Sequence, residues 1–154
     1  LGGGLIIVGA PWWRGAAKAI VRIETGFFSW GTDFDELNNP YECGLGKWCK
    51  LDGEHDFLAK AALRRIQEEG AREALVGLQL AAGEPLPSVV KPMPITDASG
   101  AVIGTLRASV WSPRLNKNIA LGRIASGHST LGSTVKADVG TGVIEATVVG
   151  VPFA

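Results

Sequence analysis

The sequence predicts an α+β fold in which a mixed first part, ending near Arg72, is followed by a small antiparallel β domain. The clearest helical segment, Leu58–Glu69, lies in the first part. After Arg72 come short β-rich runs separated by Gly, Pro, Asp and Ser, with no helical pattern between them. Successive strands without intervening helices are typical of an antiparallel barrel or sandwich. The 154 residues suffice for one sizeable core or two small ones.

The first part opens with two apolar segments. Leu5–Val8 is a short β-branched run bounded by glycines, which predicts a buried strand. Four apolar residues then recur at helical spacing and predict a helix over residues 16–24: Ala16, Ala17, Ile20 and Ile23. Gly26 is placed to end this helix, because glycine readily adopts the conformation found after helix C-termini.

Residues 27–46 are rich in Gly, Asp, Asn and Pro, with aromatic side chains between them. This composition predicts an ordered loop, anchored by Phe27, Phe28, Trp30 and Tyr41. The acidic residues Asp33, Asp35 and Glu36 do not have the spacing of an EF-hand calcium loop. We interpret them as a solvated acidic turn.

The segment Leu58–Glu69 is predicted to be a helix capped by Asp56 and ended by Gly70. Its apolar positions form one face, which we expect to pack on a sheet: Ala59, Ala62, Leu63 and Ile66. The doublets Arg64–Arg65 and Glu68–Glu69, one turn apart, are interpreted as a solvated face.

Five β-rich runs follow: Leu75–Leu80, Ala101–Ser112, Ile119–Ile124, Thr134–Val139 and Val143–Val149. Two segments between them are typical of hairpin turns, Asp97–Gly100 and Gly140–Gly142. Gly83–Pro94 contains four prolines and is predicted to be a loop inside the β domain.

Composition excludes several classes of function. The formal net charge is zero, with 15 basic and 15 acidic residues spread along the chain, which gives no support for a nucleic-acid partner. No apolar run approaches the length of a membrane span, and no signal peptide is visible. We expect reduced thiols at Cys43 and Cys49 in a cytoplasmic protein, and no metal site, because His55 and His128 are far apart in the sequence.

Five motifs occur in order in the first part: Arg22–Gly26, Trp30–Gly31, Asn39–Pro40, Glu42–Gly46 and Asp56–Leu63. Their order and spacing resemble the C-terminal half of the tetrahydrofolate-dependent aminomethyltransferases, the glycine cleavage T-protein family, which includes folate-dependent demethylases. The resemblance extends from about Gly9 to the end of the chain. It implies that residues 1–72 complete a folate-binding α+β domain and that residues 73–154 form a small β-barrel.

The resemblance also implies an activity: transfer of a one-carbon unit from a small amine, sulfonium or ether donor to tetrahydrofolate. The family's catalytic Asp and much of its substrate pocket belong to an N-terminal half that this chain lacks. We therefore predict no catalytic residue here and an inactive isolated chain. Residues 39–46 resemble demethylases such as dimethylsulfoniopropionate demethylase, whereas residues 29–33 resemble dimethylglycine and sarcosine dehydrogenases, so the donor is not predicted.

Three residues are predicted to contact tetrahydrofolate. Arg22 offers a rigid guanidinium fork for carboxylate or carbonyl oxygens, and the family's matching Arg lies beside the folate. Trp30 offers a flat ring for stacking at a position that flanks the same pocket. Glu24 is a candidate polar contact whose alternative role is a purely structural ion pair.

The β domain departs from the family pattern at two places. Arg107 and Ala108 replace small hydroxyl residues, and Arg114–Leu115 replaces Thr-Leu after Ser112–Pro113. Two alternative hypotheses remain open: a non-catalytic folate-binding module, and a structural or interaction domain. Because the first part lacks strand partners, we also predict that its exposed apolar side chains make the isolated chain prone to aggregation.

Overall fold

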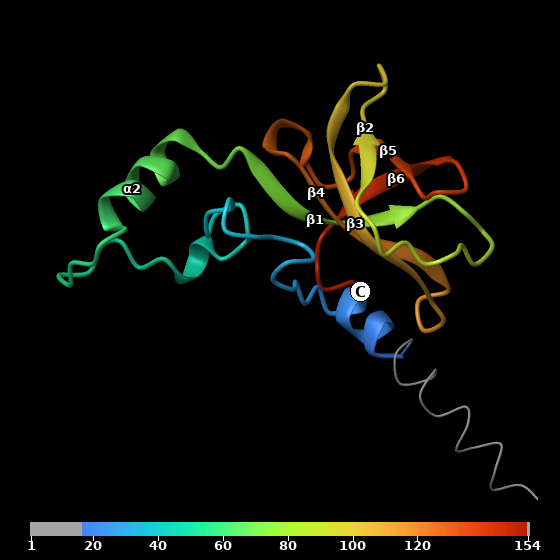
Figure 1. Cartoon of the computed structure of the whole chain (residues 1–154), viewed down its shortest axis with the longest axis horizontal. Coiled ribbons are helices and arrows are strands. Elements are labelled where there is room, and N and C mark those ends of the chain that lie inside the picture. Colours follow the sequence, from blue (N-terminus) through green and yellow to red (C-terminus); the bar gives the residue numbers. More distant parts are fainter. Residues whose placement is uncertain (1–16, 154) are drawn as a thin grey trace, which may run out of the picture.

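The computed structural model describes residues 17–153 and contains a closed six-stranded antiparallel barrel (Figure 1). The strands follow the order β1-β4-β3-β2-β5-β6 around the barrel. Their bounds are Glu73–Leu80 for β1, Met93–Thr96 for β2, Val102–Ser112 for β3, Lys117–Ala125 for β4, Thr134–Asp138 for β5 and Val143–Val149 for β6. The predicted antiparallel β domain is therefore confirmed, as a barrel and not a sandwich.

Alternation along the strands divides the apolar side chains between two clusters. On β4, Ala120 and Ile124 belong to the main core, whereas Ile119 and Leu121 belong to a second cluster. Since successive side chains of a strand point to opposite faces, the second cluster lies on the other face of β4 from the main core. A register shift in the β3–β4 pairing between Leu106 and Ala108 moves β3 from one cluster to the other.

The second cluster is covered by the chain before and after the barrel. Residues 17–24 are helical, and their buried Ile23 packs in this cluster together with Phe153 from the C-terminal segment. The helix ends as predicted at Gly26, which has a φ of +65°. A Cβ at Gly26 would lie 2.6 Å from the Cβ of Val151, so glycine is also required by the close approach of the C-terminal segment.

Residues 46–70 form an arm that extends away from the barrel (Figure 1). The arm contains the 3₁₀ turn η1 (Gly46–Trp48) and the helix α2 (Lys60–Glu69). A second 3₁₀ turn, η2 (Ser126–His128), follows β4. The predicted strand Leu5–Val8 lies outside the described residues.

The helix α2 differs from its prediction at its start and on its apolar face. It begins at Lys60, two residues late, and Asp56 does not cap it; its carboxylate accepts instead from the backbone N–H of Phe57 at 3.0 Å. The expected packing on a sheet is wrong for the described residues: Ala59 and Ala62 are exposed, and Leu63 and Ile66 are half-buried.

The remaining expectations for the barrel are largely confirmed. The turn at Asp97–Gly100 has a φ of +89° at its glycine, and the Asp97 carboxylate accepts backbone N–H groups from Ser99 and Ala101. The sequence did not predict strand β2, which begins inside the predicted loop Gly83–Pro94. Pro94 is tolerated because it pairs only with β3, while the pairing of β2 with β5 starts at Ile95.

Candidate functional site

Arg22, on the helical segment 17–24, is held by the loop that follows this helix. Its guanidinium forms an ion pair with Asp33, and its Nε donates to the Ser29 hydroxyl at 3.1 Å. The same Asp33 oxygen accepts the backbone N–H of Ser29 at 2.6 Å. These contacts orient the guanidinium, and the Arg22 side chain as a whole keeps 20% of its surface exposed.

The interpretation of Asp33 as part of a solvated turn is wrong. Asp33 is fully buried, whereas Asp35 is half-buried and only Glu36 is exposed. A buried carboxylate is stable only when it is paired and hydrogen-bonded, and Arg22 and Ser29 supply both kinds of contact. Sequence spacing did not reveal this pair, because Arg22 and Asp33 are eleven residues apart and are brought together only by the fold of the loop between them.

Glu24 joins the helical segment to the barrel. One carboxylate oxygen accepts from the Ser112 hydroxyl at the end of β3, and the other accepts from Arg114 Nε at 2.9 Å. The backbone carbonyl of Glu24 also accepts the N–H of Phe153 at 2.8 Å. The Ser112 hydrogen bond and the Arg114 charge hold the pKa of the Glu24 carboxyl below its ordinary value, against the opposing effect of burial. Arg114, a departure from the family pattern, is thus a structural partner of Glu24.

Trp30 lies on the exposed side of the loop, with 64% of its surface accessible. Its ring packs edge-on against Phe34, with centroids 5.8 Å apart and an angle of 82° between the planes. A short parallel bridge joins the same two residues through the backbone. Phe34 therefore orients the Trp30 ring and leaves one large aromatic surface free.

Among the described residues, the three predicted folate contacts have different neighbours. Arg22 and Glu24 are two positions apart on a helix, so their side chains leave it in directions about 200° apart. Accordingly, the two side chains bind different partners. Arg22 contacts the loop, Glu24 contacts the barrel, and Trp30 is exposed.

Glu42 is a buried acid at a position where the sequence indicated only a tight turn. Its fully buried carboxylate accepts from Arg72 Nε at 2.9 Å and from the backbone N–H of Asn39 at 3.2 Å. Burial raises the pKa of Glu42, but the hydrogen bonds from Arg72, Asn39 and Asn38 outweigh it and bring the pKa below its ordinary value. Asn38 also accepts a hydrogen bond from Arg123 on β4, so this network ties the loop to the barrel.

A second connection between loop and barrel comes from Arg107, the other departure from the family pattern. Its Nε donates to the carbonyl of Thr32 at 2.7 Å, next to the buried Asp33. Strand β3 thus helps to place the loop that carries Trp30.

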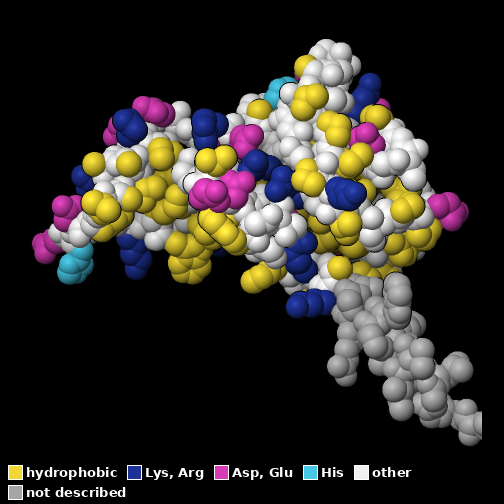
Figure 2. Space-filling view, in the orientation of Figure 1, with side chains coloured by type: hydrophobic (Ala, Val, Ile, Leu, Met, Phe, Trp, Pro, Cys, Tyr) yellow, Lys and Arg dark blue, Asp and Glu magenta, His cyan; other side chains and the backbone are white. Residues whose placement is uncertain are grey.

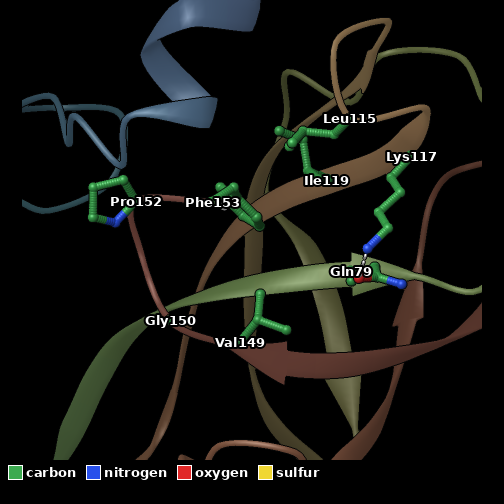
Figure 3. A pocket seen from close by; sticks show the side chains of 8 residues that line it. All are labelled: Gln79, Leu115, Lys117, Ile119, Val149, Gly150, Pro152 and Phe153. Atoms are coloured by element: carbon green, nitrogen blue, oxygen red, sulfur yellow. Dashed lines mark hydrogen bonds between the residues drawn. The ribbon is translucent and has the colours of Figure 1, made fainter.

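Two hollows adjoin these contacts. One, of about 310 Å³, lies between the loop and the barrel and is lined mainly by apolar groups, including Phe28, Trp48, Leu75 and Val151, with Lys47 also contributing. The other, of about 320 Å³, lies on the barrel beside the C-terminal segment (Figure 3). Neither hollow is lined by Arg22, Glu24 or Trp30.

Other kinds of site find little support in residues 17–153. No group of three or more His, Cys, Asp or Glu side chains in this range is arranged to hold a metal ion. Cys43 and Cys49 are free thiols, and burial together with the neighbouring Glu42 raises the pKa of Cys43. None of the helices in this range is long and apolar enough to cross a membrane.

Comparison with known protein families supports the resemblance found in the sequence. The family model of the glycine cleavage T-protein C-terminal barrel domain matches residues 74–154. An aminomethyltransferase of Symbiobacterium thermophilum is 33% identical over 137 residues, covering 89% of this chain and 36% of the relative. The dimethylsulfoniopropionate demethylase DmdA of Ruegeria pomeroyi is 31% identical over 134 residues, covering 87% of this chain and 35% of the relative. The chain therefore spans little more than a third of the length of these relatives.

A solved structure shows the same fold. The glycine cleavage system aminomethyltransferase T from Bartonella henselae superimposes with a TM-score of 0.71 at 18% sequence identity. The match covers 90% of this chain and 38% of that protein. It therefore extends beyond the barrel into the segment that precedes it.

Proposed function

Since the chain belongs to the glycine cleavage T-protein C-terminal barrel family, we propose that it is the C-terminal portion of a tetrahydrofolate-dependent transferase. The whole protein would move an aminomethyl or methyl group from a small donor to tetrahydrofolate, in the cytoplasm. The observation that carries this proposal is the joint match of the barrel to the family model and of 89% of the chain to an aminomethyltransferase. Because aminomethyltransferases and a demethylase are similarly related to the chain, the donor stays open.

We propose that residues 1–72 complete a folate-binding α+β domain whose remainder precedes this chain, and that residues 73–154 are the barrel domain. The distribution of exposed aromatic side chains supports this division. In the described part of the chain, the exposed aromatic side chains all precede the barrel: Phe27, Trp30, Trp48 and Phe57. Figure 2 shows hydrophobic side chains along the arm. Such a concentration indicates a surface that another part of the protein covers.

Arg22 and Trp30 are the proposed folate contacts. Asp33 and Ser29 fix the Arg22 guanidinium, and Nη1 makes no hydrogen bond to the described residues, which leaves donors for a carboxylate or carbonyl of the ligand. Phe34 orients the exposed Trp30 ring for stacking on a planar group. A direct contact by Glu24 stays a prediction, since both its oxygens already accept from Ser112 and Arg114.

The chain's own role would be to bind and position, because the acid expected to polarise the donor lies in the part that precedes it. Holding the two reactants together supplies much of the acceleration in such a reaction. We therefore expect no transfer by the 154-residue chain alone.

Tetrahydrofolate titration of the full-length protein, followed by tryptophan fluorescence, tests the proposal. Removing Arg22 leaves Asp33 buried and unpaired, so Arg22→Lys is preferable to Arg22→Ala because it retains the positive charge. We expect Arg22→Lys and Trp30→Leu each to weaken binding about tenfold, or about 1.4 kcal/mol. Arg65→Lys on the exposed face of α2 is the matched control and should change nothing.

Each alternative outcome has a distinct meaning. Folate binding without transfer from any donor would favour a non-catalytic folate-binding module. Absence of folate binding by a folded full-length protein would leave only a structural role for Arg22 and Trp30, and the transferase proposal would be wrong.

A further inference from the structure

The hollow of about 320 Å³ on the barrel has two chemically different sides (Figure 3). Strands β1, β4 and β6, the turn between β3 and β4, and the C-terminal segment all contribute to it. Its lining residues are Gln79, Leu115, Lys117, Ile119, Val149 and the segment residues Gly150, Pro152 and Phe153.

The apolar side is well packed from below. Ile119 is 1% exposed and Phe153 is 8% exposed, and both belong to the second cluster beneath the helical segment 17–24. Leu115 and Val149 are half-buried and pack against the same cluster. A floor made of close-packed core side chains is preformed, so a ligand would not have to order it.

The polar side presents several hydrogen-bond donors. Lys117 Nζ donates to Gln79 Oε1 at 3.0 Å, which engages one lone pair of the amide oxygen and turns the amide nitrogen away from the lysine (Figure 3). The ammonium keeps further N–H groups, and the amide keeps its NH₂. Among the described residues no carboxylate lies within ion-pair distance of Lys117. The positive charge at this edge is therefore not compensated by the described part of the protein.

We propose that this hollow binds a small amphipathic monocarboxylate. Its carboxylate would accept from Lys117 and from the amide nitrogen of Gln79, and its apolar body would lie against Ile119, Phe153 and Leu115. Ligand pockets commonly enclose about 300–1,000 Å³, and the volume here lies at the lower end of that range, which limits the ligand to a small molecule. Because the hollow does not include Arg22 or Trp30, this inference is independent of the proposed folate site.

Titration of the ¹⁵N-labelled full-length protein with 4-phenylbutyrate tests the inference. We expect saturable shifts of the amide signals of Val149, Gly150 and Phe153. The neutral analogue 4-phenylbutanamide fills the same volume without the charge and should bind more weakly. The test uses no folate, so it is decided separately from the proposed transferase function.

Charge variants of Lys117 complete the test. Replacing an exposed ion-pair partner changes affinity by up to about 1 kcal/mol, so we expect Lys117→Gln to weaken 4-phenylbutyrate binding up to roughly fivefold. Lys117→Glu should weaken it further, whereas neither variant should alter binding of the amide. Lys136→Gln, at an exposed lysine of β5 outside the hollow, is the control.

Two results would overturn the inference. One is the absence of shifts at Val149, Gly150 and Phe153 up to the solubility limit of 4-phenylbutyrate. The other is equal affinity of the wild-type chain and both Lys117 variants, which would show that the lysine does not recognise the carboxylate.

Discussion

At the scale of single residues, the first part of the chain is organised by buried acids. Asp33 and Glu42 are fully buried and Glu24 nearly so, and each is paired with an arginine: Arg22, Arg72 and Arg114, respectively. Removing one partner of such a pair costs more than the pair itself contributes, because the remaining charge or polar group loses its compensation. We therefore expect these contacts to specify how the helix, the loop and the barrel are joined more than they add to stability.

Glu24→Gln should destabilise the protein in a pH-dependent way. In the folded chain the pKa of Glu24 lies below its ordinary value of 4.5. Its contribution is therefore present above the pKa of the unfolded chain and is lost as the pH falls through the lower folded pKa. We expect Glu24→Gln to lower the free energy of unfolding by about 1.5–3 kcal/mol at neutral pH, as for hydrogen bonds to charged groups.

Urea unfolding of wild type and Glu24→Gln as a function of pH measures this effect. The two stability curves should converge at acid pH, where the wild-type carboxyl is protonated. The exposed Glu36→Gln is the control and should stay close to wild type throughout. Parallel curves for wild type and Glu24→Gln would contradict an ionised role for Glu24.

At the scale of elements, the junction between the helical segment 17–24 and the barrel depends on Gly26. This residue combines a left-handed backbone with the closest side-chain approach of Val151, so two separate effects oppose any larger residue. The arm shows the opposite situation. Helix α2 ends at Gly70 as predicted, but its apolar face has no sheet to pack on among the described elements.

Gly26→Ala should be markedly destabilising. The left-handed conformation costs about 1 kcal/mol for a non-glycine residue. Overlap with Val151 should add about 1–3 kcal/mol, as overpacking does elsewhere. Thermal unfolding of the variant measures the sum.

Two control glycines separate the backbone effect from the steric effect. Gly31 has a φ of +76° but open space around it, so Gly31→Ala should show only the backbone cost. Gly53→Ala has neither feature and should stay within about 0.5 kcal/mol of wild type. Equal effects at Gly26 and Gly31 would show that the contact with Val151 is unimportant.

At the scale of the whole molecule, a closed barrel is joined to an arm with exposed apolar side chains. The largest exposures in the arm include Leu58 at 107% and Trp48 at 70%. Polar contacts of Arg107 and Arg123 tie the loop to the barrel. We therefore expect the isolated chain to self-associate through the arm and not through the barrel.

Substituting the arm should relieve this association. Trp48→Ser combined with Leu58→Ser removes two exposed apolar groups and should shift sedimentation profiles of the isolated chain toward the monomer. Val102→Ser, at a barrel side chain that is 70% exposed, is the control and should leave the profile unchanged. Monomeric wild-type chain, or an equal response to Val102→Ser, would contradict this expectation.

Local patterns were sufficient for much of this architecture. Short β-rich runs, separated by Gly, Pro, Asp and Ser, predicted β1, β3, β4, β5 and β6, because β-branched residues favour strands and the residues between the runs favour turns. The strand β2 was missed, since its four residues contain a proline and its partners lie elsewhere in the chain. The family was also predicted from motif order and is confirmed by the match over residues 74–154.

The sequence by itself determined the family, the antiparallel β domain and the ends of two helices at Gly26 and Gly70. Only the tertiary structure decided the order of the strands around the barrel, the burial of Asp33 against Arg22, and the contacts of Glu24 with Ser112 and Arg114. The physical reason is the distance along the sequence over which each interaction acts. Periodicity and turn chemistry act between neighbours, whereas burial and charge pairing depend on residues as far apart as Glu24 and Arg114, which are 90 positions apart in the sequence.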